Sequence, residues 1–376
     1  MKTVLRASTL GLCLLSFGCP QLLDDGFSSF GTDGGAPSNG GGGGAPASAG
    51  SAGAGGASGS HAAAAGAGPS GGAGQANGAS GGGSGSAGSA GSSGSAGGSG
   101  AGGAAGAAAC NFGDFSAPEL LSTLGRADAL YGPALSGNGL VLAFSESLES
   151  APEDIFLSQR AARDSAFGAA LPALGVNTVD AEGTAFLTGD ARVLYFFSDR
   201  SGGPGDRDIY RATRGDGSAE FTDVRLVEGI NGNTDDHTPW LSPDERTLYF
   251  ASNRAADSDG NNLWFAQRSS PLDGFEPPRE VPGMNSDERD ISPSLSADQR
   301  TLVFCSDRDG GAGSDDIWMA TRDDAASDFG TPAPVPVVNG TASELNVALS
   351  DDGRELIFSS SRSGDRRLYR SVRACL

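Results

Sequence analysis

The central part of this chain contains the segment Leu241-Ser-Pro-Asp-Glu-Arg-Thr-Leu-Tyr-Phe-Ala-Ser-Asn-Arg254, in which a polar turn precedes an apolar run that ends in Ser. A close copy follows at Leu295-Ser-Ala-Asp-Gln-Arg-Thr-Leu-Val-Phe-Cys-Ser-Asp-Arg308. The apolar runs alternate as strands do, and the Ser-x-Asp sequences suit tight β-turns. The segment therefore predicts a pair of strands, and its copy predicts a repeat.

Five such runs occur, and the serines that end them recur at a near-constant interval: Ser145, Ser198, Ser252, Ser306 and Ser360. A repeat interval of about 50 residues is typical of propeller blades. Each repeat is interpreted as four short antiparallel strands, of which the run is the second. The third strand is marked by Ile155, Ile209, Leu263, Ile317 and Leu368, and the fourth opens with Phe167, Phe221, Phe275 or Phe329. We predict an all-β, five-bladed β-propeller over residues 110–376.

The last repeat has no room for a fourth strand before Leu376. The segment Phe115–Leu124 resembles Phe329–Val338 in its Phe, its Pro and its later apolar positions. We therefore expect the N-terminal strand to complete the C-terminal blade, which closes the ring and removes two exposed sheet edges.

The cysteines fit this closure. In the continuous blades the spacing from the third-strand marker to the fourth-strand Phe is constant, as from Ile155 to Phe167. Across the seam, the spacing from Leu368 to Cys375 and that from Cys110 to Phe115 add up to the same value. We predict a Cys110–Cys375 disulfide, with two free thiols as the alternative. Cys305 lies in an apolar column and is expected to be a buried free thiol.

The repeats resemble the WD-like β-propeller repeats of bacterial envelope proteins, as in TolB-like domains. The two segments quoted first carry the resemblance, together with the Gly-rich loop between Ser306 and Trp318. The resemblance covers residues 112–376. It implies a scaffold for interactions and does not specify a ligand. TolB-like domains commonly have six blades, whereas we count five here.

Residues 1–18 are predicted to be a signal peptide, because Lys2 and Arg6 precede an apolar run that is too short to span a bilayer. The segment Leu15–Cys19 resembles a bacterial lipoprotein signal, although Ser16 and Phe17 depart from its usual pattern. We predict lipidation at Cys19 and an outer-membrane lipoprotein, periplasmic or surface-facing. A secreted protein is the alternative, because Ser16 and Gly18 also suit ordinary signal peptidase.

Gly, Ala and Ser dominate residues 34–109, so this part cannot bury enough apolar surface to fold. We predict that residues 19–109 form a disordered tether. The tether should join the propeller on the face opposite the loops that lead into the innermost strands.

The net charge of −21 argues against binding to nucleic acid and leaves cations, basic partners and neutral ligands open. Acidic residues recur at a constant interval at the predicted start of the innermost strands: Glu182, Asp236, Asp290 and Glu344. Four carboxylates meeting at the channel mouth could bind a cation such as Ca²⁺ or a basic ligand, and His237 is a further candidate. The alternative is that the acids cap local turns.

Two other columns are expected to be structural. Asn177, Asn231, Asn285 and Asn339 suit tight turns. Arg200, Arg254, Arg308 and Arg362 are predicted to pair with Asp208 or Asp316 across the Gly-rich hairpin.

No catalytic triad, zinc cluster or phosphate loop is evident, and we assign no catalytic residue, confident metal site or required cofactor. The sequence favours a monomeric, membrane-tethered binding module for an envelope protein, a peptide or a glycan, with contact to the membrane only through the lipid anchor. The alternative is a carbohydrate-active or other hydrolytic enzyme that uses Asp236, Asp290 or Glu344.

Overall fold

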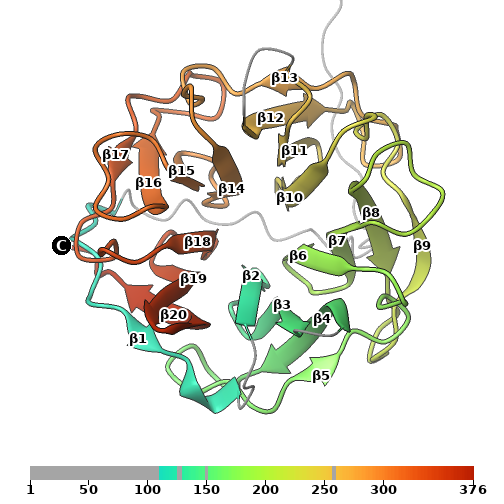
Figure 1. Cartoon of the computed structure of the whole chain (residues 1–376), viewed down its shortest axis with the longest axis horizontal. Coiled ribbons are helices and arrows are strands. Elements are labelled where there is room, and N and C mark those ends of the chain that lie inside the picture. The colour runs from blue at the N-terminus through green and yellow to red at the C-terminus, as the bar shows by residue number, and fades with distance from the viewer. Residues whose placement is uncertain (1–109, 125–128, 149–150, 256–259) are drawn as a thin grey trace, which may run out of the picture. The chain divides into compact units, whose positions relative to one another are not determined.

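The computed structural model describes residues 110–124, 129–148, 151–255 and 260–376. Within them, five four-stranded antiparallel sheets are arranged in a ring (Figure 1), and residues of the five inner strands line a central channel. No helix among these residues is long and apolar enough to cross a membrane. The predicted signal peptide, Cys19 and the tether lie outside the described residues.

The prediction of five blades is confirmed, and each blade runs from an inner to an outer strand. The first three blades are β2 (Ala129–Leu135), β3 (Val141–Leu148), β4 (Ala151–Gln159) and β5 (Leu171–Pro172); β6 (Glu182–Leu187), β7 (Val193–Ser198), β8 (Asp208–Thr213) and β9 (Thr222–Leu226); and β10 (Asp236–Leu241), β11 (Thr247–Ser252), β12 (Asn262–Gln267) and β13 (Arg279–Glu280).

The fourth blade is β14 (Asp290–Leu295), β15 (Thr301–Ser306), β16 (Asp316–Thr321) and β17 (Ala333–Pro334). The fifth joins the two ends of the domain, because its strands are β18 (Glu344–Leu349), β19 (Glu355–Ser363), β20 (Asp365–Val372) and the N-terminal β1 (Glu119–Leu120). Glu119 pairs with Arg370 and Leu120 with Tyr369. A short 3₁₀ helix, η1 (Ser122–Leu124), follows β1. The predicted closure by the N-terminal strand is confirmed.

The outer strands begin later than predicted in most blades. Phe167, Phe275 and Phe329 precede β5, β13 and β17 by several residues, and only Phe221 lies directly before its strand, β9. In three blades proline explains the difference, because it cannot donate a ladder hydrogen bond. Pro118, Pro278 and Pro332 stand between the Phe and the strand in these blades, whereas no proline occurs between Phe221 and Leu226 or between Phe167 and β5. The outer strand of that blade is the longest, at 5 residues.

An Arg covers the outer-strand Phe in every blade, and this contact shows that the seam reproduces the repeat. Arg160, Arg214, Arg268 and Arg322 lie 4.2–4.7 Å from the ring centroids of Phe167, Phe221, Phe275 and Phe329. Arg373 lies 4.6 Å from the ring centroid of Phe115. The fifth blade is built from both ends of the domain, and yet it packs as the continuous blades do.

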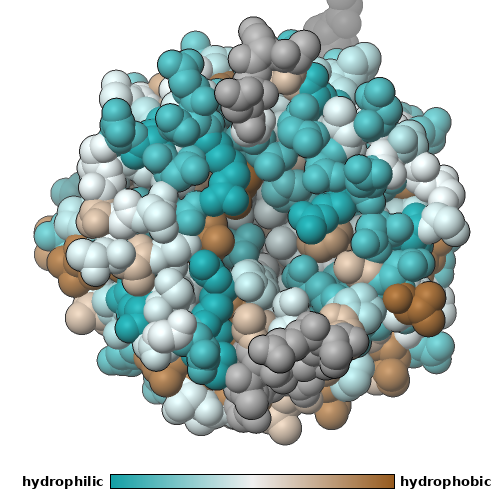
Figure 2. Space-filling model, in the orientation of Figure 1, coloured by the Kyte–Doolittle hydropathy of each residue, from teal (hydrophilic) through white to brown (hydrophobic). Residues whose placement is uncertain are grey.

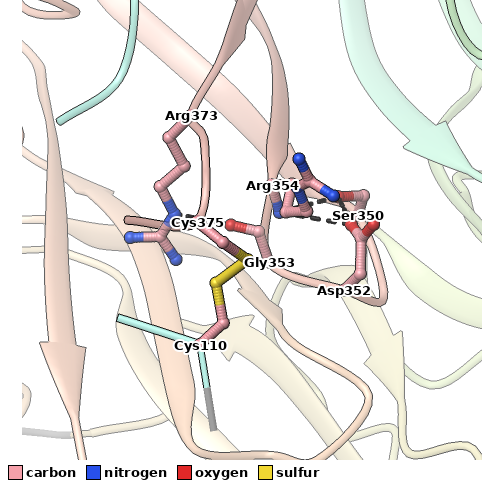
Figure 3. Close-up of a disulfide and its surroundings, with 7 residues drawn as sticks. All are labelled: Cys110, Ser350, Asp352, Gly353, Arg354, Arg373 and Cys375. Carbon is pink, nitrogen blue, oxygen red and sulfur yellow. Dashed lines mark hydrogen bonds between the residues drawn. A yellow bond between two sulfur atoms is a disulfide. The ribbon is translucent and has the colours of Figure 1, made fainter. Parts of the chain in front are cut away.

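Cys110 and Cys375 form the predicted disulfide, beside the turn that follows β18 (Figure 3). Arg373 Nε donates a hydrogen bond to the Gly353 carbonyl in this turn. Cys110 therefore lies on the face of the propeller where the inner strands finish, near the rim where Figure 1 marks the C-terminus. Cys305 is a fully buried free thiol, and burial raises its pKa to about 12.

Candidate functional site

Four of the five inner strands begin with an acidic residue, and these residues form the acidic column Glu182, Asp236, Asp290 and Glu344. All four are 0% exposed. Each pairs with the Arg that stands two residues after the repeated Ser of the second strand of its own blade: Arg200 at 3.0 Å, Arg254 at 2.5 Å, Arg308, and Arg362 at 2.9 Å.

Each carboxylate also caps the loop that leads into its strand. It accepts a hydrogen bond from the backbone amide four residues earlier, at 2.6–3.0 Å: Thr178, Gly232, Ser286 and Gly340. The same arrangement recurs in four blades and leaves the carboxylates enclosed. This geometry favours the turn-capping alternative over an open cation or ligand site.

The predicted pairing of the Arg column with Asp208 or Asp316 is wrong. Asp208 instead accepts hydrogen bonds from the Gly205 amide, and Asp316 from the amides of Ala312 and Gly313. The Gly-rich loop folds back so that its backbone amides donate hydrogen bonds to the Asp at the end of the same loop. The Arg side chains are thus left to the acidic column.

The Asn column has the structural role that was expected. The side chains of Asn177, Asn231, Asn285 and Asn339 each accept a hydrogen bond from the amide of the third-strand marker 22 residues earlier, at 2.6–3.0 Å. The same Asn donates to the carbonyl of that marker residue. The column therefore ties each turn to the third strand of the preceding blade.

His237 is buried at the mouth of the channel, directly after Asp236. Burial lowers the pKa of its imidazole to about 4; the charges of Arg207 and Arg289 add to the shift, and the Asn261 side chain opposes it. The imidazole is therefore neutral at physiological pH.

This lowered pKa makes stability depend on pH. Between pH 6.5 and 4 the His237 imidazole is protonated in the unfolded chain but not in the folded protein. The contribution of the neutral imidazole to the free energy of unfolding is therefore fully present above pH 6.5 and is lost as the pH falls toward 4. We expect this residue to remove about 3 kcal/mol from the free energy of unfolding across that window. Urea titrations of the wild type and of His237→Gln test this: the variant should lack that part of the slope, and equal slopes would contradict it.

A second column at the mouth has a different residue in almost every blade. We name Glu153, Arg207, Asn261, Asp315 and Arg366 the mouth column; each stands two residues before the third-strand marker. The Arg207, Asn261 and Asp315 carbonyls accept the amides of Asp236, Asp290 and Glu344 at the start of the next inner strand, at 2.7–2.9 Å. The backbone thus holds these residues beside the channel.

The other two members of the mouth column, Glu153 and Arg366, also lie beside the first residues of an inner strand. A Cβ added to Gly183, at the start of β6, would clash with Glu153 Oε1. The Arg366 guanidinium lies 5.5 Å from the ring centroid of Tyr131, at the start of β2. The mouth column therefore surrounds the channel, and Figure 2 shows hydrophilic residues around a central hollow on this face.

Polar contacts link part of the mouth column. Asp315 forms an ion pair with Arg289 and accepts a hydrogen bond from Ser343 Oγ at 2.7 Å. Arg366 Nη2 donates to the same hydroxyl at 3.0 Å. Arg366 Nη1 is buried and has no hydrogen-bond partner among the described residues. A buried donor without a partner is costly, so a ligand acceptor at this point would be favoured.

Glu153, another member of the mouth column, has a carboxyl group with a shifted pKa. Burial raises the pKa of its carboxyl and the charge of Asp199 adds to this, whereas a hydrogen bond from Ser145 and the charge of Arg207 oppose it. Its blade lacks the acidic column residue and has Leu130 there. Within the part of the chain that the structure describes, no group of three or more His, Cys, Asp or Glu could hold a metal ion.

Below the mouth, small residues with left-handed backbone narrow the channel. This channel ring consists of Gly132, Thr184, Thr238, Ser292 and Asn346, with φ between 40° and 58°. Thr184 Oγ1 accepts the Thr238 amide at 3.2 Å, and Thr238 Oγ1 accepts the Ser292 amide at 3.3 Å. A Cβ at Gly132 would lie 2.6 Å from the Thr184 Cα, so this position requires glycine. The ring joins neighbouring blades across the channel.

The sequence analysis missed both the mouth column and the channel ring. The signal was available, since four mouth-column members recur at the same interval as the acidic column, and so do four ring members. A search for one repeated residue type finds the acidic column and passes over positions whose residue types differ.

No protein-family model and no curated protein matches this sequence. Solved structures with a similar fold include TolB from Acinetobacter baumannii, at 14% identity and a TM-score of 0.38, where the match covers 66% of this chain and 55% of TolB. They also include the arabinanase Arb43A from Bacillus subtilis, at 12% identity and a TM-score of 0.44, covering 65% of this chain and 94% of that one. A third is the catalytic domain of the GH62 α-L-arabinofuranosidase from Coprinopsis cinerea, at 13% identity and a TM-score of 0.47, covering 70% and 98%. The chain thus spans about half the length of TolB, and these likenesses concern the propeller fold alone.

Proposed function

We propose that this protein is a non-catalytic binding module that holds a polar ligand (an envelope protein, a peptide or a glycan) against the mouth column. One observation carries the proposal. The acidic, Arg and Asn columns keep one residue type or two similar ones in four blades, whereas equivalent backbone positions at the mouth present Glu, Arg, Asn, Asp and Arg. Symmetry in side chains suits blade construction, and differing side chains on a symmetric backbone suit recognition of one asymmetric partner.

The hydrolase alternative receives less support from the geometry. Asp236, Asp290 and Glu344 each use one carboxylate oxygen for an Arg and receive a backbone amide, and all are enclosed. A general acid or nucleophile must reach the reacting atoms of its substrate. These three enclosed residues do not meet that requirement.

The rest of the proposal concerns location. A monomeric propeller would be exported, cleaved before Cys19 and held at the outer membrane by a lipid on that residue. Since Cys110 lies on the face of the propeller opposite the mouth column, the mouth would face away from the anchoring membrane. This orientation would present the binding face to partners in the periplasm or at the cell surface.

Replacing Arg366 with Gln tests the site. Arg366→Gln removes the charge and the unpartnered donor, and we expect at least a tenfold loss of affinity, because hydrogen bonds to charged groups contribute about 1.5–3 kcal/mol. Glycan and peptide arrays probed with the full chain would identify ligands, and titration of the best one would give the affinities.

Arg225→Ala is the matched control, because Arg225 is 57% exposed on the outer strand β9. It should bind as the wild type does. The same ligands should show no turnover on prolonged incubation. Equal affinity of Arg366→Gln and the wild type would remove the mouth column as the site, and turnover by the wild type would favour the hydrolase.

A further inference from the structure

The channel ring lines the upper part of a pocket with a cavity volume of about 40 Å³. Its lower wall includes Ala134, Phe186, Trp240, Ser294 and Ala348, one residue from each inner strand. The rings of Phe186 and Trp240 meet edge to face at 6.0 Å. Most of this wall is therefore apolar, and two of its five side chains are aromatic.

One carboxylate breaks the symmetry at the end of this pocket. Asp351 lines the pocket, and the equivalent positions of the other blades hold Gly137, Gly189, Pro243 and Ala297. A Cβ added to Gly137 would lie 2.5 Å from Asp351 Oδ2. The Asp351 side chain thus extends from the fifth blade to the first, across positions where neighbouring blades carry little or no side chain.

This carboxylate receives no hydrogen bond from any described residue. The nearby cation Arg163 is engaged elsewhere: its Nη1 binds Asp352 at 2.5 Å, its Nε donates to the Asn138 carbonyl at 3.1 Å and its Nη2 to the Gly137 carbonyl at 3.4 Å. Burial raises the pKa of Asp351, the charge of Arg163 opposes the shift, and Asp352 adds to it. A partly buried carboxylate without a protein donor gains from a cationic partner that donates hydrogen bonds to it.

The chemistry of the pocket selects one class of partner. Calcium requires six or more oxygen ligands and commonly several carboxylates, which a single Asp cannot supply. An alkylammonium group needs only one anionic partner. It also makes cation–π contacts with aromatic rings, and its methylene groups can pack against apolar walls. The net charge of −21 also raises the local concentration of cations.

We propose that this pocket binds an alkylammonium group, either a small aliphatic amine or a lysine side chain, with the charge on Asp351 and the methylenes against Trp240 and Phe186. This site is independent of the mouth column. It lies toward the face of the propeller that carries the Cys110–Cys375 disulfide, since Asp351 stands between Ser350 and Asp352 of the turn drawn in Figure 3.

The test titrates the full chain with butylammonium, 1-butanol and butyrate at neutral pH, followed by calorimetry and tryptophan fluorescence. Butylammonium should bind at least ten times more tightly than 1-butanol, and butyrate should not bind. A tripeptide with a central lysine, compared with its norleucine analogue, distinguishes the two sources of the ammonium group: preference for the free amine indicates a small ligand, and preference for the peptide indicates a lysine side chain.

Asp351→Asn should weaken butylammonium binding at least tenfold, because it removes the charge and keeps the shape. Asp223→Asn is the control with the same change in net charge; Asp223 is 53% exposed and has a left-handed φ of 51° that Asn tolerates. Equal binding by Asp351→Asn and the wild type would overturn the proposal. Equal affinity of the wild type for butylammonium and 1-butanol would overturn it without any variant. Mouth ligands should bind Asp351→Asn normally, so failure here leaves the proposed function unaffected.

Discussion

Replacing both Cys110 and Cys375 with Ser is expected to lower the free energy of unfolding by about 5 kcal/mol, because the disulfide closes a loop with a sequence separation of 265 residues. Such a cross-link restricts the unfolded chain far more than a short-range one. The seam has few other restraints: β1 contributes only two paired residues, and backbone hydrogen bonds such as Gly113 to Ala374 and Leu376 to Asn111 hold the remainder.

Loss of the bond should be felt throughout the ring. Once β1 leaves β20, the fifth blade has an exposed edge, and the Arg373 guanidinium loses Phe112 and Phe115. Urea unfolding of the wild type, the double variant and the reduced wild type measures the effect; the last two should agree. Cys305→Ala removes a thiol without removing a cross-link, and its cost should be about 1 kcal/mol. A double variant within about 1 kcal/mol of the wild type would show that β1 holds the seam unaided.

The seam was predictable because it depends only on counting. The spacing between third-strand marker and fourth-strand Phe is kept across the chain ends, and a propeller must close. The same counting gave the number of blades and the burial of Cys305. It placed most outer strands too early, since the position of a Phe does not say where the ladder begins; in three blades a proline delays that start.

Contacts between columns could not be counted in this way. Arg254 can reach the acid that opens its own blade or one in the following hairpin, and the sequence spacing allows both. The fold of the Gly-rich loop decides, because its amides satisfy Asp208 and Asp316 and leave the Arg to the acidic column. The mouth column shows the converse case. Its backbone positions repeat, but its residue types do not, so their importance emerges only once the ring geometry is known.

Asp290→Ala should destabilise the protein by about 3–5 kcal/mol, the cost of removing one partner from a buried ion pair. Arg308, with a side chain only 14% exposed, would keep its bonds to Ser306 Oγ and the Met284 carbonyl but lose its counter-charge. The Ser286 amide, 2.7 Å from Asp290 Oδ2, would lose its acceptor. Arg225→Ala, which breaks the exposed pair with Asp223, should cost about 0–1 kcal/mol.

Thermal and urea unfolding of both variants and of Asp290→Ala/Arg308→Ala gives the coupling energy of the buried pair. The same proteins separate the two interpretations of the acidic column. If the carboxylates cap the turns, Asp290→Ala loses stability, while its folded molecules still bind a mouth ligand with the affinity of the wild type. If the carboxylates bind ligand, affinity falls and stability holds, because an acid kept for a partner contributes little to the empty blade. Since Asp290 is enclosed, paired and capping in the ligand-free protein, we expect the first result.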